Sequence, residues 1–395
     1  MSEDALDRID RLIQVGLRLA LSAKSGRVLL ARIAAAIDDE WIPRPWGDTI
    51  AVELAAAHAA ACEPIEAKRI ERTLRDAWGG PATGELDAFD PAPVAITPTA
   101  QVHRGVLDGA PVAIKVQRPG LAAAIRQDLA LVDGLRRPLG AAFPALDVAA
   151  VLAEVRERAL DELDLESEAA VHRRFHRALR GHPYLTTPAP IMRLCSSEVL
   201  VSEWVDGVAL RDAADPADAA ARLIAFVIGS ARSGTMYAAP HPDDVLVTAD
   251  GRLAILDYGT TSLVDVARLD AVAATLRGLI DVDAGGFGSG LAQLGWLPAA
   301  HGETALALVR DALGELADPA PAHLDADALV LARDRLLSRP AAIAELVVAG
   351  AVPASDLWPT LAVVQLFFTI ARLGAAGSWC ELSQSALRDG WEAKA

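Results

Sequence analysis

Residues 100–120 read AQVHRGVLDGAPVAIKVQRPG, and this stretch decides the fold. Two runs rich in β-branched residues, AQVHRGVL and PVAIKV, are separated by Asp108-Gly109, a dipeptide that readily adopts positive φ and closes tight hairpins. We therefore predict two antiparallel strands. Lys115 ends the second strand, where a lysine is more often a solvated edge residue than a ligand-binding one.

The segments on either side of the hairpin predict the rest of the architecture. Residues 3–37, 49–62 and 64–78 have helical periodicity, and residues 89–94 (FDPAPV) are rich in turn formers. Helical patterns fill residues 120–180, and strands are expected at IMRLC (191–195), VLVSEWV (199–205) and within residues 245–259. This order predicts an α+β fold with a small mixed lobe before a larger, mostly helical lobe.

Charge and cysteine usage disfavour several classes of function, although the overall charge is compatible with a local basic cleft. The 395 residues carry a formal net charge of -16, which disfavours general nucleic-acid binding and electrostatic attachment to anionic membranes. Cys62, Cys195 and Cys380 are widely spaced, which indicates a reducing compartment and no zinc site.

No segment has the pattern of a secretory signal or a membrane span. The acidic N-terminus lacks a basic region followed by an apolar core. The apolar residues 357–376 are interrupted by Pro359, Gln365 and Arg372, so we expect a core helix there. We predict a cytoplasmic protein without a transmembrane segment, with peripheral membrane contact left open.

Several strings in the correct order resemble the UbiB/AarF family of atypical kinases. They are FDPAPVA, AQVHR, PVAIKVQRPG, ELDLESEAA, VLVSEWVDGVAL and HPDDVLVTADGRLAILDYG, and together they cover about residues 50–285. The resemblance implies a two-lobed protein-kinase-like fold that binds ATP or ADP with Mg²⁺. It divides the chain into a helical N-terminal extension (1–90), an N-lobe with inserted helices (91–206) and a helical C-lobe (207–395).

Three residues match the nucleotide-binding positions of that family. Lys115 matches the lysine that reaches the α- and β-phosphates, and Glu168 matches the glutamate that pairs with it. Asp257, in Asp257-Tyr-Gly259, matches the aspartate that holds Mg²⁺. Without the surrounding strings, that tripeptide would more often be a turn after a strand.

Three further residues are expected near the cofactor. Glu162 and Asp164 match the family's ExD element, although an ordinary acidic helix face is the alternative. Gln101 follows the loop that covers the phosphates, and we place it among the cofactor-binding residues.

The catalytic loop departs from the family pattern. Where the family reads approximately ADPHPGN, this chain reads AAPHPDD, so Ala239 replaces the presumed catalytic base. Asp244 replaces the asparagine that contacts a second metal ion, and it can itself bind Mg²⁺. Asp243 or Asp244 could substitute for the missing base. Pro98 also stiffens the phosphate-covering loop and removes an N–H group.

The family's KxGQ element, which folds over the active site, has only a degenerate counterpart. The nearest candidate is Lys24-Ser-Gly-Arg27, which lacks the glutamine. A surface arginine on an amphipathic helix is the alternative interpretation of Arg27.

Three functions remain open at this point. The first is a pseudokinase or very weak ATPase that binds Mg·ATP or Mg·ADP and is linked, through the resemblance, to isoprenoid or quinone-like lipid or small-molecule metabolism. The second is an active ATPase or small-molecule kinase that uses Asp243 or Asp244. The third is a nucleotide-free binding or assembly scaffold. The possible partners are a nucleotide, an isoprenoid-like lipid or another protein, and no nucleic acid.

Overall fold

The hairpin predicted from the sequence lies at the centre of a four-stranded antiparallel sheet with the order β1-β2-β3-β5. We describe residues 12, 15–16, 46–161 and 163–392 of a computed structural model of the protein. Between β2 (Ala100–Leu107) and β3 (Ala110–Gln117), Asp108 and Gly109 have φ values of 51° and 77°, as a type I′ turn requires. The predicted hairpin is therefore confirmed.

Two expectations near this sheet are wrong. Residues 89–94 belong to the edge strand β1 (Ala88–Ile96), whose register with β2 shifts on both sides of Pro93. An edge strand tolerates prolines because one side of it needs no ladder hydrogen bonds. The expected strand at IMRLC is instead a 3-10 turn, Met192–Leu194, before β5 (Val199–Glu203).

Helices cover both faces of the sheet. On one face, Ile70 and Leu74 of α4 (Ala67–Trp78) pack in one cluster with Val112, Ile114 and Val116 of β3. On the other face, α8 (Leu165–Ala178) packs on β5. Helix α4 thus belongs to the same core as the sheet, and residue 90 falls within β1. The expected division of the chain at residues 90 and 206 stays a prediction.

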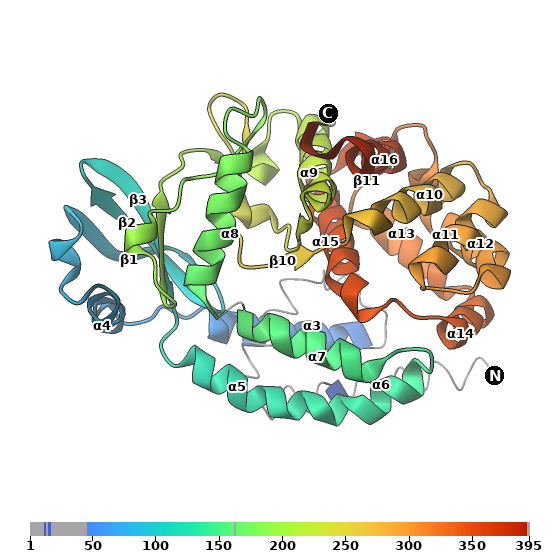
Figure 1. The fold of residues 1–395 in the computed structure, drawn as a ribbon, viewed down its shortest axis with the longest axis horizontal. Coiled ribbons are helices and arrows are strands. Elements are labelled where there is room, and N and C mark those ends of the chain that lie inside the picture. Colours follow the sequence, from blue (N-terminus) through green and yellow to red (C-terminus); the bar gives the residue numbers. More distant parts are fainter. Residues whose placement is uncertain (1–11, 13–14, 17–45, 162, 393–395) are drawn as a thin grey trace.

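Three inserted helices follow β3, namely α5 (Leu121–Val132), α6 (Arg136–Ala142) and α7 (Val148–Asp161). They lie with α3 (Trp46–Ala61) below both lobes in Figure 1.

The C-lobe has a buried core around α9 (Pro216–Ser230), α15 (Leu357–Leu373) and α16 (Trp379–Asp389). Its other helices are α10 (Leu269–Ile280), α11 (Ala284–Leu294), α12 (Gly302–Leu313), α13 (Ala326–Leu337) and α14 (Pro340–Ala349). Its sheet has the order β4-β9-β8-β6, formed by Leu185–Thr186, Leu253–Ile255, Val245–Val247 and Val208–Ala209. Two short pairs complete the lobe: β7 (Thr235–Tyr237) with β10 (Thr261–Leu263), and β11 (Ala322–Leu324) with β12 (Ala375–Gly377). Figure 1 shows this lobe beside the smaller mixed lobe, so the expected α+β architecture is confirmed.

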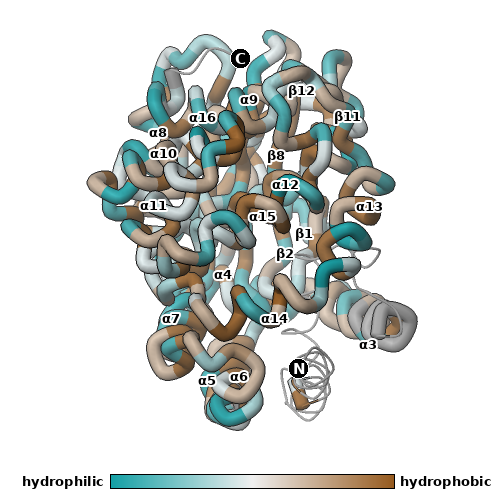
Figure 2. The backbone as a smooth tube through the Cα atoms, turned by 90° about the vertical axis from the view of Figure 1, so that its right-hand side faces the viewer, coloured by the Kyte–Doolittle hydropathy of each residue, from teal (hydrophilic) through white to brown (hydrophobic). Residues whose placement is uncertain are grey.

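Helix α15 comes from the longest apolar segment of the described chain. The stretch Ala354–Leu373 is long and apolar enough to cross a membrane, and 33% of an 18-residue apolar segment within it is buried in the protein. Ala362, Leu366 and Ile370 form part of the C-lobe core, whereas Leu361 and Val364 are exposed. Figure 2 shows apolar and polar stretches interleaved over the helices on this side of the molecule. One such helix is weak grounds for a membrane span, since core helices of soluble proteins pass the same test.

Candidate active site

The side chain of Lys115 leaves the sheet on the face opposite to α4. Alternate residues of a strand point to opposite faces, and Ile114 and Val116 are fully buried against α4. Lys115 pairs with Val102 on one neighbouring strand and with Leu200 on the other, and Leu200 packs under α8. The lysine therefore points toward α8 and the C-lobe.

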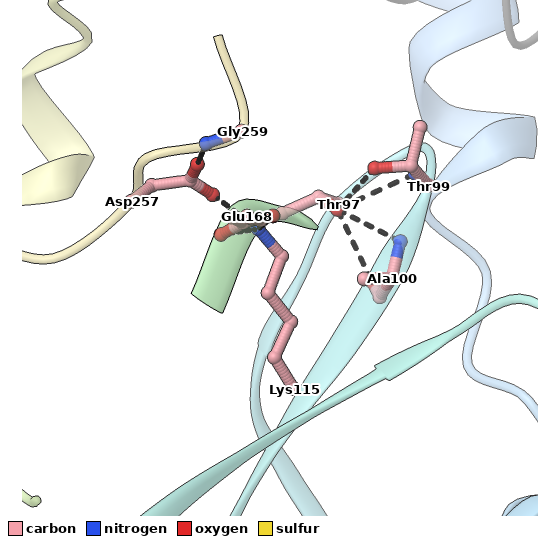
Figure 3. A network of polar contacts seen from close by, with 7 residues as sticks. All are labelled: Thr97, Thr99, Ala100, Lys115, Glu168, Asp257 and Gly259. Atoms are coloured by element: carbon pink, nitrogen blue, oxygen red, sulfur yellow. Dashed lines mark hydrogen bonds and ion pairs between the residues drawn. The ribbon is translucent and has the colours of Figure 1, made fainter. Parts of the chain in front are cut away.

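Lys115 joins carboxylates from both lobes. Its Nζ donates to Glu168 Oε1 and Oε2 at 2.9 and 3.0 Å and to Asp257 Oδ2 at 2.6 Å. Glu168 projects from α8, and Asp257 follows β9 in the C-lobe (Figure 3). We call these three residues the clamp. The structure brings together the three predicted residues, and their roles toward a ligand remain predictions.

The first turn of α8 holds Glu168 in place. Asp164 is the N-cap of this helix, and its Oδ1 accepts the N–H groups of Glu166 and Ser167 at 3.0 and 3.3 Å. Asp164 thus has a capping role that positions the helix bearing Glu168, and it is not part of the clamp. Glu162, like Lys24 and Arg27, lies outside the described residues.

Gly259 fixes the orientation of Asp257. Its N–H donates to Asp257 Oδ1 at 2.7 Å, so one carboxylate oxygen faces the backbone and the other faces Lys115. A Cβ at position 259 would lie 3.1 Å from that Asp257 oxygen and 3.2 Å from Glu168 Oε2. Glycine is therefore the residue that allows both carboxylates to approach this turn.

The clamp carries more negative than positive charge. Burial and the charge of Asp257 raise the pKa of Glu168 to about 7, despite the opposing effect of Lys115. Burial also acts to raise the pKa of Asp257, but the charge and hydrogen bond of Lys115 and the N–H of Gly259 hold it below its ordinary value. Burial and the charge of Asp257 raise the pKa of Asp244 well above its usual range.

The loop after β7 carries Asp243 and Asp244, whose surroundings differ. The side chain of Asp243 is 69% exposed and lies 3.9 Å from Arg211 and 3.8 Å from His241. Burial lowers the pKa of His241. The backbone oxygen of Asp244 accepts the N–H of Leu256, the residue before Asp257. Asp244 is thus close enough to Asp257 for the charge of that carboxylate to add to burial in raising its pKa, whereas Asp243 is exposed beside Arg211. Ala239, half-buried in this loop, offers no group for proton transfer.

The structure places Gln101 elsewhere, contrary to our expectation. It pairs with Val116 and is fully buried on the α4 face, where its side chain accepts the N–H of Ile65 and contacts His103 Nε2 at 3.3 Å. Cross-strand pairs share a face of a sheet, so Gln101 and Lys115 lie on opposite faces. Gln101 cannot contact a ligand held by Lys115 without a rearrangement of the strand.

The turn between β1 and β2 satisfies its own backbone donors. Thr97 Oγ1 accepts from the N–H groups of Thr99 and Ala100 at 3.3 and 2.9 Å, and the Thr97 N–H donates to Ala100 O at 2.9 Å. Pro98 has no N–H to offer. Arg118 Nε donates to Thr97 O at 3.1 Å and ties the turn to the end of β3 (the turn is drawn with the clamp in Figure 3).

A residue that the sequence did not single out supports the clamp. His172 is fully buried on α8, and its ring stacks on Tyr258 with centroids 4.7 Å apart. Its Nε2 lies 3.0 Å from Thr187 Oγ1, which donates to Ile255 O. The signal was its spacing of four residues from Glu168, which places both side chains on one helix face.

The carboxylates of Asp257 and Asp244 fit a Mg²⁺ ion that also takes phosphate oxygens and water as ligands. Among the residues that the structure describes, no group of three or more His, Cys, Asp or Glu side chains converges as a preformed metal site. Asp257 and Asp244 are two hard oxygen donors in a locally anionic place. Mg²⁺ commonly binds to one or two carboxylates plus phosphate oxygens and water, so the residues present fit that mode.

Comparison with known proteins identifies relatives of this chain. Residues 58–288 match the model of the ABC1 atypical kinase-like domain. Arabidopsis thaliana Activity of BC1 Complex Kinase 1, a chloroplast protein, is 28% identical over 237 residues, which are 57% of this chain and 35% of that protein. A chloroplast aarF domain-containing protein kinase of the same plant is 33% identical over 191 residues, which cover 47% and 27% of the two chains. The chain thus spans about a third of the length of these relatives.

The fold extends beyond the matched domain. The structure of Mycobacterium tuberculosis Rv3197, solved as a complex with erythromycin, superposes with a TM-score of 0.62. The alignment covers 94% of this chain and 92% of that one at 22% identity, so it speaks for the shared fold alone.

Proposed function

The chain belongs to the ABC1 atypical kinase-like family, and from this premise we propose that it binds Mg·ATP or Mg·ADP as a pseudokinase or very weak ATPase. Membership confirms the resemblance to the UbiB/AarF group seen in the sequence. The single observation that carries the proposal is the contrast between the complete clamp and the alanine at position 239.

The clamp supplies the binding half of a kinase site. Lys115 would exchange part of its contact with the carboxylates for phosphate oxygens, while Glu168 keeps its ammonium group in place. Asp257 and Asp244 would hold Mg²⁺, which neutralises phosphate charge when bound. A divalent cation held there would also offset the charge of Asp257, which adds to burial in raising the pKa values of Glu168 and Asp244.

Two features that assist phosphoryl transfer are missing: a general base in the catalytic loop and free backbone N–H groups in the turn before β2. A positioned general base contributes roughly 10²–10⁴-fold in rate, and Ala239 provides none. The N–H groups of the Thr97–Ala100 turn are occupied within the turn, which leaves no backbone donor there for a phosphate.

The geometry supports the active-enzyme alternative less well. Asp243 is exposed and faces Arg211, and Asp244 has the surroundings of a metal ligand beside Asp257. Neither side chain lies in the loop position of Ala239. A link to isoprenoid or quinone-like lipids rests on the family resemblance alone, and solvent extraction followed by mass spectrometry tests it.

Isothermal titration with Mg·ADP tests the proposal. We expect saturable binding that EDTA abolishes and that Asp257→Asn and Lys115→Met each weaken by about tenfold or more, a loss of about 1.4 kcal/mol. Lys68→Met, which changes an exposed lysine on α4, is the matched control and should bind like the native protein. Because Lys115→Met removes a buried ion pair, circular dichroism must show that each variant is folded. Absence of Mg²⁺-dependent binding in the folded native protein would overturn the proposal.

A further inference from the structure

Acidic residues are missing from one interval of a chain that is otherwise strongly acidic. The sequence has 53 Asp and Glu residues against 37 Lys and Arg, yet none of the acidic residues lies between Glu168 and Glu198. The same interval contains five arginines: Arg173, Arg174, Arg177, Arg180 and Arg193. Positive charge is therefore concentrated in α8 and the segment that follows it.

Four of these arginines are exposed and make no ion pair with any residue in the described part of the chain. Arg193 pairs with Glu85 at 3.0 Å, which accounts for the fifth. Arg173, Arg174 and Arg177 lie on α8, and Arg180 lies in the turn after it. We call these four residues the arginine stripe.

The arginine stripe occupies the outer face of the helix that carries the clamp glutamate. Glu168, His172 and Phe175 are buried and define the inner face of α8. Arg173 and Arg177 are one turn apart, about 6 Å along the axis, with Arg180 continuing the row. In Figure 1 no other element is drawn over α8.

Helix stability alone gives no sufficient reason for this arrangement. Like charges four residues apart on a helix destabilise it by roughly 0.2–0.5 kcal/mol per pair. Arg177 lies in the last turn, where the helix dipole stabilises a positive charge and offsets part of this repulsion. Arg173 and Arg174 lie further from the C-terminus of the helix. No acidic residue lies three or four positions from Arg173 or Arg177 to compensate them.

We infer that the arginine stripe is a docking surface for an acidic segment of a partner protein. Carboxylates spaced about 6 to 7 Å apart, as on one face of a helix or one side of a strand, match the one-turn spacing of Arg173 and Arg177. Arginine also binds carboxylates in a bidentate geometry.

The whole-molecule charge argues for a short acidic segment and against extended polyanions. A membrane surface or a nucleic acid would extend past the stripe and meet the rest of a protein with a net charge of -16. A short peptide segment needs to touch only α8.

Binding of a fluorescein-labelled oligoglutamate peptide, followed by anisotropy in about 50 mM salt, tests this inference. We expect saturable binding to the native protein and about tenfold weaker binding to the triple variant Arg173→Gln/Arg177→Gln/Arg180→Gln. The matched control is Arg69→Gln/Arg72→Gln/Arg75→Gln on α4, where the arginines have the acidic neighbours Glu66, Glu71 and Asp76 in the sequence. This variant should bind the peptide like the native protein. The native protein should not bind oligoglutamine.

Three results would overturn the inference. The first is equal oligoglutamate binding by the two triple variants. The second is binding of single-stranded DNA or phosphatidylserine vesicles by the native protein without binding of the peptide. The third is a fall in the melting temperature of the α8 variant, relative to the α4 variant, without a loss of peptide binding, which would show that the arginines serve the helix itself. The assay contains no nucleotide, so it succeeds or fails independently of the proposed function.

Discussion

Lys115, Glu168 and Asp257 meet because three different local rules place them. Strand alternation turns Lys115 away from the α4 core, the Asp164 cap starts the helix that presents Glu168, and Gly259 lets Asp257 approach both. The sequence identified these residues because the strings around them resemble those of the UbiB/AarF family, whereas Lys115 or Asp257 alone would more often be an edge residue or part of a turn.

Gln101 was expected near the cofactor because it follows the phosphate-covering loop. That expectation ignored the face of the strand to which its side chain points. The hairpin register that follows from Asp108-Gly109 pairs Val102 with Lys115, so Gln101 had to point to the other face. Asp164 could also have been recognised from the sequence, since an aspartate directly before a helix is a common N-cap. The position of Asp244 beside Asp257 followed from the family resemblance, and the pairing of β8 with β9 accounts for it.

The buried imidazole of His172 makes stability depend on pH. Burial lowers its pKa from 6.5 to about 4, despite the attraction of Asp257. Between these values the unfolded state binds a proton that the folded state does not, so stability falls as pH falls from about 6.5 to about 4. The shift corresponds to a loss of up to about 3 kcal/mol from this group.

Urea unfolding at pH 7 and pH 4.5 measures this dependence. His172→Gln removes the titrating group while keeping a side chain that can contact Thr187, and it should lose less stability between the two pH values than the native protein. His323→Gln, at an exposed histidine, is the control and should retain the native slope. An unchanged slope in His172→Gln would contradict the assignment.

At the scale of the elements, periodicity predicts the helices and turn chemistry predicts the central hairpin. Neither signal predicts β1. Its prolines indicated a turn, and only its edge position in the sheet makes them compatible with a strand. The segment at residues 191–195 shows the opposite error, because a short apolar run does not distinguish a strand from a 3-10 turn.

The contact between α10 and α11 depends on a glycine. A Cβ at Gly278 would lie 2.8 Å from Phe287 Cα, and backbone cannot yield as a flexible side chain can. We expect Gly278→Ala to destabilise the protein by about 1–3 kcal/mol through overpacking. Gly285→Ala, at an exposed position of α11 with only Asp283 Oδ1 at 3.4 Å, should be neutral or stabilising by about 0.5 kcal/mol.

Chemical unfolding of the two variants measures the difference. A Gly278→Ala protein as stable as the Gly285→Ala protein would show that the two helices can separate without cost.

At the scale of the whole molecule, the clamp links the lobes through side chains from β3, α8 and the turn after β9. The two-lobed fold could be predicted because the family strings occur in order along the chain. The packing of α4 on the sheet could not, because it is a tertiary contact with no local signal. Under the proposed function, nucleotide binding would need both lobes in place, and efficient phosphoryl transfer would also need a general base that Ala239 does not supply.

Phosphorus NMR of equimolar protein and Mg·ATP tests binding without transfer in a single sample. We predict shifted and broadened β- and γ-phosphate resonances in the presence of Mg²⁺, loss of this effect in Asp257→Asn, and a γ-phosphate signal that persists over hours. Stoichiometric conversion of that signal to inorganic phosphate or a phosphorylated product by the native protein, abolished in Asp257→Asn, would contradict the account, as would unperturbed resonances of free ATP.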